Sequence, residues 1–258
     1  MNYTDVNSKT VDSWVEEGWE WGTPISSEVF AAAKCGEWDV FLTPLKPVPE
    51  QWFLPFIKPS KRLDGTMILG LASGGGQQMP IFTASGAVCT VFDYSQKQLD
   101  NEADVARRED YQIEIKRGDM TKPLPFADNS FDLIFHPVSN CYVEDIEPIW
   151  HECYRVLKPG GVLLTGMMRD IVYIFDEDDP LKVIHKLPYN PLKDSELYKK
   201  CIDGNWGITF SHTLEQQIGG QLRAGFVLSD LYTDGDNQGG VADFMSTCMA
   251  TRAVKPEV

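Results

Sequence analysis

Three consecutive glycines, Gly74–Gly76, follow an apolar run and precede a helix-like segment in the stretch GLASGGGQQMP, residues 70–80. Because glycine has no side chain, the backbone N–H groups of such a turn can approach a ligand closely, and the start of the helix adds partial positive charge. The turn therefore predicts a site for a carboxylate or a phosphate. The alternative is a tight strand-to-helix turn that binds nothing.

Asp93 stands seventeen residues after Gly76, at the end of a second apolar run in TVFDYS. Doubly wound α/β proteins use an acidic side chain at this place to accept hydrogen bonds from ribose hydroxyls. A strand-end aspartate by itself is also typical of a helix cap or a turn. Together, the glycine turn and Asp93 indicate a ligand that contains adenosine.

A nicotinamide or flavin dinucleotide also contains adenosine, and its binding turn has the pattern G-x-G-x-x-G. Counted from Gly74, the last glycine of that pattern is replaced by Met79, and counted from Gly70 the stretch is GLASGG. Neither register fits the pattern. An NAD-dependent oxidoreductase is therefore only an alternative.

Short apolar runs alternate with helical patterns after Thr66. Strand-like runs occupy residues 66–72, 87–93, 111–119, 131–137 and 161–167, with helical patterns at 95–110 and 143–161. This alternation predicts a parallel sheet with helices on both faces. A helical pattern at 211–226 leads to two runs, 227–235 and 244–255, whose short connection predicts an antiparallel hairpin. We therefore expect an α/β, Rossmann-like doubly wound, mostly parallel seven-stranded sheet that ends in this hairpin.

The first 62 residues differ in composition from the rest, being rich in tryptophan and proline. Prolines exclude one long helix, and many aromatic residues argue against disorder. We expect a cap segment over residues 1–62 and a single domain over 63–258. Residues 168–210 form a long insertion in that domain, and such connections usually carry function or local order.

Charge and composition narrow the function classes. The chain has 38 acidic and 23 basic residues, a net charge of −15, which disfavours nucleic-acid binding and suits a small or cationic partner. The alternative is that the acidity only aids solubility. Six cysteines form no CxxC pair and four histidines no HxH or HExxH pattern, so no metal site is predicted. Without a membrane-length apolar stretch or a signal-peptide pattern, we expect a cytoplasmic protein that binds no membrane.

Four stretches together resemble the class I S-adenosylmethionine-dependent methyltransferases, in particular the small-molecule branch that includes ubiquinone- and menaquinone-type enzymes. ILGLASGGG resembles their first motif, VFDYS the acidic second motif and RGDM the loop that holds adenine, and residues 126–166 resemble the fourth-strand to fifth-strand block. The resemblance covers about residues 63–170 and, more loosely, the closing hairpin. It implies S-adenosyl-L-methionine as cofactor, a methyltransferase domain over 63–258, and methyl transfer to a small molecule by in-line displacement.

The resemblance also implies which residues bind the cofactor. The glycine turn and the helix after it would hold the methionine part, the second strand the ribose, the following loop the adenine, and the end of the fourth strand the sulfonium. In that order the residues are Ala72, Ser73, Gly74, Gly76, Gln77 and Gln78; Asp93 and Tyr94; Asp119 and Met120; and His136 and Pro137.

His136 is the candidate catalytic base if the acceptor must lose a proton, because imidazole titrates near neutrality. Its alternative is a hydrogen-bonded structural role. Asn140, Tyr142 and Glu144 follow in the same loop and are candidates for the substrate pocket. Three tryptophans of the cap are candidates for a lid that stacks on a flat or cationic acceptor, or else pack against the sheet edge: Trp14, Trp19 and Trp21.

Two positions depart from the family pattern. The family usually has an acidic residue at the place of Gly70 and a glycine at the place of Ala72. Loss of the acid removes a group that orients the loop or the cofactor, so a non-catalytic cofactor-binding or regulatory protein is a further alternative. Alanine at position 72 is tolerable if its φ stays negative.

Overall fold

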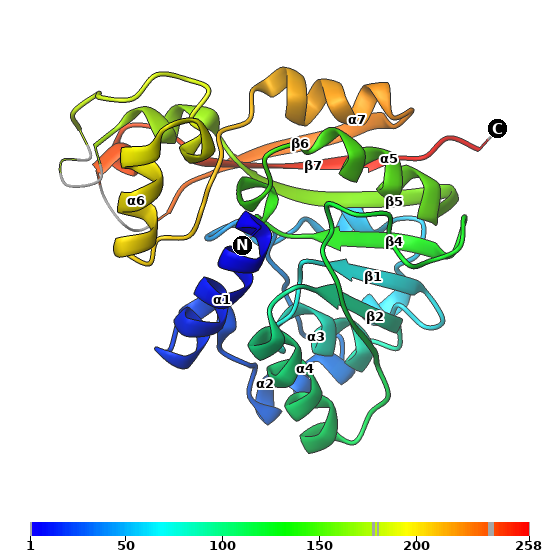
Figure 1. Cartoon of the computed structure of the whole chain (residues 1–258). Helices are drawn as coiled ribbons and strands as arrows, with labels where there is room; N and C mark the ends of the chain where they lie inside the picture. The colour runs from blue at the N-terminus through cyan, green and yellow to red at the C-terminus, as the bar shows by residue number, and fades with distance from the viewer. Residues whose placement is uncertain (1, 177–178, 180, 237–239, 258) are drawn as a thin grey trace.

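The computed structural model describes residues 2–176, 179, 181–236 and 240–257, and within them seven strands form one sheet (Figure 1). The strand order is β3-β2-β1-β4-β5-β7-β6, and only β7 runs antiparallel to its neighbours. The strands are β1 (Met67–Leu71), β2 (Val88–Asp93), β3 (Glu114–Arg117), β4 (Phe131–His136), β5 (Leu157–Met168), β6 (Val227–Asp234) and β7 (Cys248–Val254). The predicted doubly wound sheet with a terminal hairpin is confirmed.

Helices cover both faces of the sheet because consecutive strand residues point to opposite faces. Ile68 packs with α3 (Gln78–Ala84) and α4 (Gln96–Glu109), whereas Leu69 packs with α5 (Glu147–Val156) on the other face. Beside α5 lie a π-helical turn, Glu215–Gly219, and α7 (Gly220–Arg223). Both clusters are fully apolar, so the sheet is the centre of the core.

Two predicted helices are shorter than their patterns suggested. The helix expected over 143–161 begins at Glu147 and ends at Val156, and the Lys-Pro-Gly-Gly stretch starts β5 instead. Gly160 has a φ of +77°, its N–H donates to Lys255 O, and Lys255 N donates to Gly161 O, so tertiary pairing extends this segment. In the 211–226 segment only Glu215–Arg223 is helical, partly as a π turn.

The N-terminal segment contains α1 (Tyr3–Glu16), α2 (Ser27–Lys34) and short 3-10 turns, as its prolines require. Trp38, Trp52 and Phe53 are buried in the same cluster as Ile68, so this segment shares the core of the sheet. The division into a cap over 1–62 and a domain over 63–258 stays a prediction.

The insertion 168–210 contains α6 (Ser195–Asp203) and packs on α1 beside the sheet (Figure 1). The rings of Tyr3 and Phe210 meet edge to face at 5.2 Å, and Tyr189 and Leu197 complete this small cluster. Among the described residues, no helix combines the length and apolar character that a membrane crossing needs.

Candidate functional site

Two cavities adjoin at the carboxyl ends of β1, β2 and β4, where the strand order reverses and doubly wound folds bind ligands. The first has a volume of about 300 Å³ and the second of about 100 Å³. Both are lined by Val11, Ala72, Asp93, Ser139 and Tyr142. Because these five residues form a common wall, the cavities are neighbouring chambers of one crevice.

The glycine turn packs tightly against α4. Its three N–H groups donate to Asp93 Oδ2 (3.1 Å), Gln98 O (2.8 Å) and Glu102 Oε2 (3.0 Å), in the order of Gly74, Gly75 and Gly76. A Cβ on Gly75 would lie 2.5 Å from Gln98 Oε1, and one on Gly76 2.7 Å from Val105 Cγ2. The expected use of these N–H groups for an anionic ligand is therefore corrected, since they hold the turn to its neighbours. Gly74 lines the first cavity, and Gly76 lines neither.

The expectation that Ala72 keeps a negative φ is wrong, because its φ is +48°. Its N–H donates to the carbonyl of Phe92 at 2.8 Å, which fixes the chain in the left-handed conformation where β1 ends. The position therefore demands what glycine provides without strain, as the family pattern implies.

Asp93 lies on the wall common to both cavities. Its Oδ2 accepts from Gly74 N and its Oδ1 from Ser95 N at 2.9 Å, so the side chain also supports the start of α4. Burial raises the pKa of this carboxyl despite those two donors. A carboxylate at the joint between the chambers is well placed to accept from the two hydroxyls of a ribose.

Three buried polar atoms on the crevice walls have no hydrogen-bond partner among the described residues. Ser73 Oγ and Gln98 Oε1 belong to residues that line the first cavity, and Thr4 Oγ1 to one that lines the second. Buried polar atoms are nearly always hydrogen-bonded in folded proteins. These atoms therefore fit a ligand with polar groups in both chambers.

Comparison with known proteins agrees with this geometry. A family model described as "Methyltransferase domain" matches residues 69–165. The uncharacterized methyltransferase YbaJ of Bacillus subtilis (strain 168) is 42% identical over 256 residues, covering 96% of this chain and 97% of the relative.

The chain belongs to the class I S-adenosylmethionine-dependent methyltransferases. S-adenosylmethionine is its cofactor, and the oxidoreductase and non-catalytic alternatives are set aside. A demethylmenaquinone methyltransferase of Corynebacterium glutamicum (strain R) is 36% identical over 109 residues, 41% of this chain and 44% of that protein. The crystal structure of a methyltransferase from Mesorhizobium loti has the same fold, with a TM-score of 0.59, 19% identity, and coverage of 80% of this chain and 95% of the other.

The surface of the second cavity is mainly apolar. Phe92, Met120 and Val143 give it apolar walls, and Asp119 and Tyr94 lie beside them. Asp119 Oδ1 accepts from the N–H of Thr121 at 2.8 Å, which fixes the carboxylate at the cavity. Apolar walls with an acidic acceptor beside them suit a flat base that carries an amino group.

Gln77 and Gln78 line the first cavity, but both also hold the N-terminal segment over it. Gln77 Nε2 donates to the carbonyls of Glu20 (2.7 Å) and Thr23 (2.9 Å), and Gln78 Oε1 accepts from Phe41 N (3.0 Å). In these glutamines the structure shows a role that the sequence did not suggest, namely closing the crevice with the N-terminal segment.

His136 lines neither cavity and is completely buried. Its Nδ1 lies 2.8 Å from Leu71 O and its Nε2 2.7 Å from Asn140 Oδ1, and burial lowers its pKa. A neutral ring donates from Nδ1 to the carbonyl and accepts at Nε2, which requires the opposite amide orientation of Asn140. In the present orientation Asn140 Nδ2 has no partner among the described residues, and the same rotation provides one. This geometry favours the structural role of His136 over that of a base.

The substrate candidates divide between the cavity and its surroundings. Pro137, Trp19, Trp21 and Tyr142 line the first cavity, and Tyr142 lines the second as well. Asn140 is 2% exposed and lines neither cavity. Trp14 donates to Asn205 O (2.8 Å), and Glu144 accepts from Asn190 Nδ2 (2.9 Å), so these two side chains bind the insertion instead.

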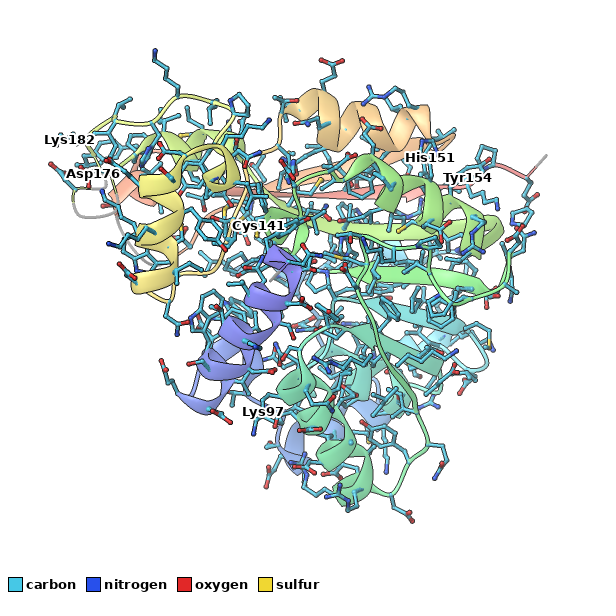
Figure 2. All side chains as sticks on the ribbon, in the orientation of Figure 1. Lys97, Cys141, His151, Tyr154, Asp176 and Lys182 are labelled. Atoms are coloured by element: carbon cyan, nitrogen blue, oxygen red, sulfur yellow. The ribbon has the colours of Figure 1, made fainter. Side chains whose placement is uncertain are left out.

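Sequence reasoning missed several crevice residues, among them one face of α1. Thr4, Asn7 and Ser8 of α1 line the second cavity, with Val11 between the two. Their spacing of three and four residues places them on one helix face, a signal that was present in the sequence. Met168, Cys141 and Cys248 line the first cavity, and in Figure 2 Cys141 is labelled near the centre of the molecule, by the N-terminal end of α1. Apolar residues of this kind carry no local signal for a site.

Proposed function

We propose that this methyltransferase acts on a small-molecule acceptor and holds its cofactor along the crevice. Asp119 and Met120 would hold the adenine, Asp93 the ribose hydroxyls, and Ser73 and Gln98 the polar end of the methionine. The observation that supports this placement is that Asp93 stands between two chambers whose walls contain polar atoms without partners among the described residues.

When bound, S-adenosylmethionine supplies a methyl group that its sulfonium makes electrophilic, so the protein has mainly to position the acceptor and exclude water. Trp19, Trp21 and Tyr142 give the first cavity large aromatic walls that can do both. No described residue on these walls is a histidine, lysine or arginine. We therefore expect an acceptor whose nucleophilic atom needs no strong base.

The size of the first cavity and the net charge of the protein support a small acceptor. The cavity of about 300 Å³ suits a small ligand, and a net charge of −15 opposes nucleic acids. The menaquinone-type relative, named for a small-molecule reaction, matches 41% of this chain.

Isothermal titration with S-adenosylhomocysteine tests the cofactor placement. We expect the wild-type protein to bind it and Asp93→Asn to bind it about tenfold more weakly or worse, because hydrogen bonds to a charged acceptor are among the strongest. Asp100→Asn is the matched control, since Asp100 is an exposed residue of α4 outside both cavities. Equal affinity in the Asp93 and Asp100 variants, or tighter binding of NADH, would refute the placement.

A further inference from the structure

A third cavity, of about 400 Å³, lies beyond the first, between the end of β5, the insertion and the β6–β7 connection. Met168 and Asp236 line both the first and the third cavity. The third cavity is therefore a continuation of the crevice on the side away from the adenine chamber. Its inner end is next to the chamber proposed for the methionine part of the cofactor.

The walls of the third cavity are rich in aromatic side chains. Tyr173, Phe175, Tyr189 and Trp206 line it, and the rings of Tyr173 and Tyr189 pack with their centroids 5.2 Å apart. Trp206 is 43% exposed and stands at the rim. Aromatic walls suit a flat apolar body, and their π faces also attract a cation.

The charge of the whole crevice has one sign. Its described lining residues include four aspartates and no lysine, arginine or histidine: Asp93, Asp119, Asp176 and Asp236. The positions that the structure does not describe add no basic residue either, since the sequence there has only Met, Glu, Asp, Pro, Asn, Gln, Gly and Val. A carboxylate or phosphate on the acceptor would face these carboxylates, and no described lining residue carries a positive charge.

Asp236 is the acidic residue on the wall that the first and third cavities have in common. Thr247 Oγ1 donates to its Oδ2 at 2.8 Å, which orients the carboxylate. Asp176 is different, because its Oδ2 lies 3.4 Å from Lys182 Nζ, and both side chains lie at the outer end of the insertion (Figure 2). Of the two aspartates that line the third cavity, Asp236 is therefore the one that also faces the first cavity.

We propose that the methyl acceptor is an amine with an aromatic or similarly flat body. Its nitrogen lies at Asp236 as an ammonium, and its body enters the cavity walled by Tyr173, Tyr189 and Trp206. For transfer, the ammonium gives one proton to the Asp236 carboxylate, and the freed lone pair forms the N–CH₃ bond while the S–CH₃ bond breaks and its electron pair stays on the sulfur of S-adenosylhomocysteine. This inference rests on the proposed function, because it takes the first cavity as the place of the cofactor's methionine part. It excludes acceptors whose recognition depends on a carboxylate or phosphate.

Three indoles of nearly equal shape test the charge preference: tryptamine, tryptophol and indole-3-propionate. Each is titrated calorimetrically into the full-length protein, with and without saturating S-adenosylhomocysteine. We expect tryptamine to bind about tenfold more tightly than tryptophol and indole-3-propionate to bind most weakly, because only the ammonium gains a charged partner. Asp236→Asn should remove the tenfold preference and leave tryptophol binding unchanged.

Asp243→Asn is the matched control, because Asp243 is an exposed acid of the same connection and does not line the cavity. A second variant, Trp206→Leu at the rim, should weaken tryptamine by about threefold or more through loss of its π face. Thermal melting and S-adenosylhomocysteine binding check that each variant is folded.

The outcomes separate the two proposals. If S-adenosylhomocysteine binds but the protein does not bind tryptamine, or binds it no more tightly than indole-3-propionate, the amine inference is wrong and the cofactor placement stands. If S-adenosylhomocysteine does not bind, the cofactor placement fails, and the indole titrations without S-adenosylhomocysteine still decide the charge preference. An unchanged preference in Asp236→Asn would also overturn the inference.

Discussion

Glu102 shows how a single buried side chain supports the glycine turn. It is fully buried on α4, its Oε2 accepts from Gly76 N at 3.0 Å, and Tyr111 Oη lies 3.4 Å from Oε1. Burial outweighs these donors and raises its pKa from 4.5 to about 8. At neutral pH the folded protein therefore keeps this carboxyl protonated, whereas the unfolded chain does not.

Glu102→Gln tests that protonation. Between pH 4.5 and 8 the folded state holds a proton that the unfolded state loses, so the free energy of unfolding falls as pH rises in this window. We expect the wild type to lose up to about 1.4 kcal/mol per pH unit relative to the glutamine variant there. Urea unfolding at several pH values measures this difference. Asp104→Asn, at an exposed site of α4, should give a profile parallel to that of the wild type, and a parallel profile for Glu102→Gln would contradict the assignment.

Ala72 stores strain at the turn, because an L residue pays for the left-handed conformation. Ala72→Gly should raise the free energy of unfolding by about 1 kcal/mol, since it removes the clash of Cβ with the following carbonyl. Urea denaturation checks the sign. Ala103→Gly, inside α4, should do the opposite, because glycine weakens a right-handed helix. A destabilised Ala72→Gly variant would mean that packing of its Cβ outweighs the strain.

At the scale of elements, the contact between β1 and α3 explains why Gly70 replaces the acid of the family pattern. A Cβ on Gly70 would lie 2.6 Å from Met79 Sδ and 2.9 Å from its Cγ, and Met79 is fully buried. The methionine thus fills the space that a side chain at position 70 needs. Met79, which stands where the G-x-G-x-x-G pattern has its last glycine, and Gly70, which stands where the family has an acid, therefore pack against each other.

A double-mutant cycle tests this coupling. Gly70→Ala should destabilise the protein by about 1–3 kcal/mol through overpacking, and Met79→Ala by about 2–5 kcal/mol through a cavity. The double variant should lose less than the sum of the two, because the new methyl group enters the space vacated by the methionine. Chemical denaturation of the four proteins gives the coupling energy, and simple additivity would show that the residues do not share space.

At the scale of the whole molecule, α1 joins the insertion to the crevice through Asn7. Its Nδ2 donates to Ile208 O (2.9 Å) and Tyr142 O (3.2 Å), and its Oδ1 accepts from Ile208 N (2.7 Å). Segments about 200 residues apart in sequence are thereby fixed beside the second cavity. The crevice depends on this assembly of three distant segments.

Asn7→Ala should therefore affect stability and cofactor binding together. It leaves the buried N–H and C=O groups of Ile208 unpaired, at a cost of about 1–3 kcal/mol each in the worst case. We expect a lower melting temperature and weaker binding of S-adenosylhomocysteine, measured by thermal unfolding with and without the compound. Asn2→Ala on the same helix makes no such loss, since Asn2 is exposed and forms no capping hydrogen bond. Equal melting temperatures and equal S-adenosylhomocysteine binding in the two variants would contradict the role of Asn7 in joining α1, the insertion and the crevice.

The sequence determined the order of the elements and the place of the site. Alternating apolar residues, the glycine turn after β1 and the acid at the end of β2 are local patterns, and local patterns determine the strands, their direction and the edge where Asp93 lies. The hairpin followed from the short connection before the last strand. These features need only neighbours in the chain.

Only the tertiary structure decided what each side chain at that edge does. His136 binds Leu71 O instead of facing the crevice, the glycine N–H groups donate to the end of β2 and to α4, and Ala72 adopts a positive φ. The third cavity arises where the insertion meets the β6–β7 connection. Burial, hydrogen-bond partners and the sign of a cavity's charge depend on residues brought together from distant parts of the chain, and no local pattern encodes those distances.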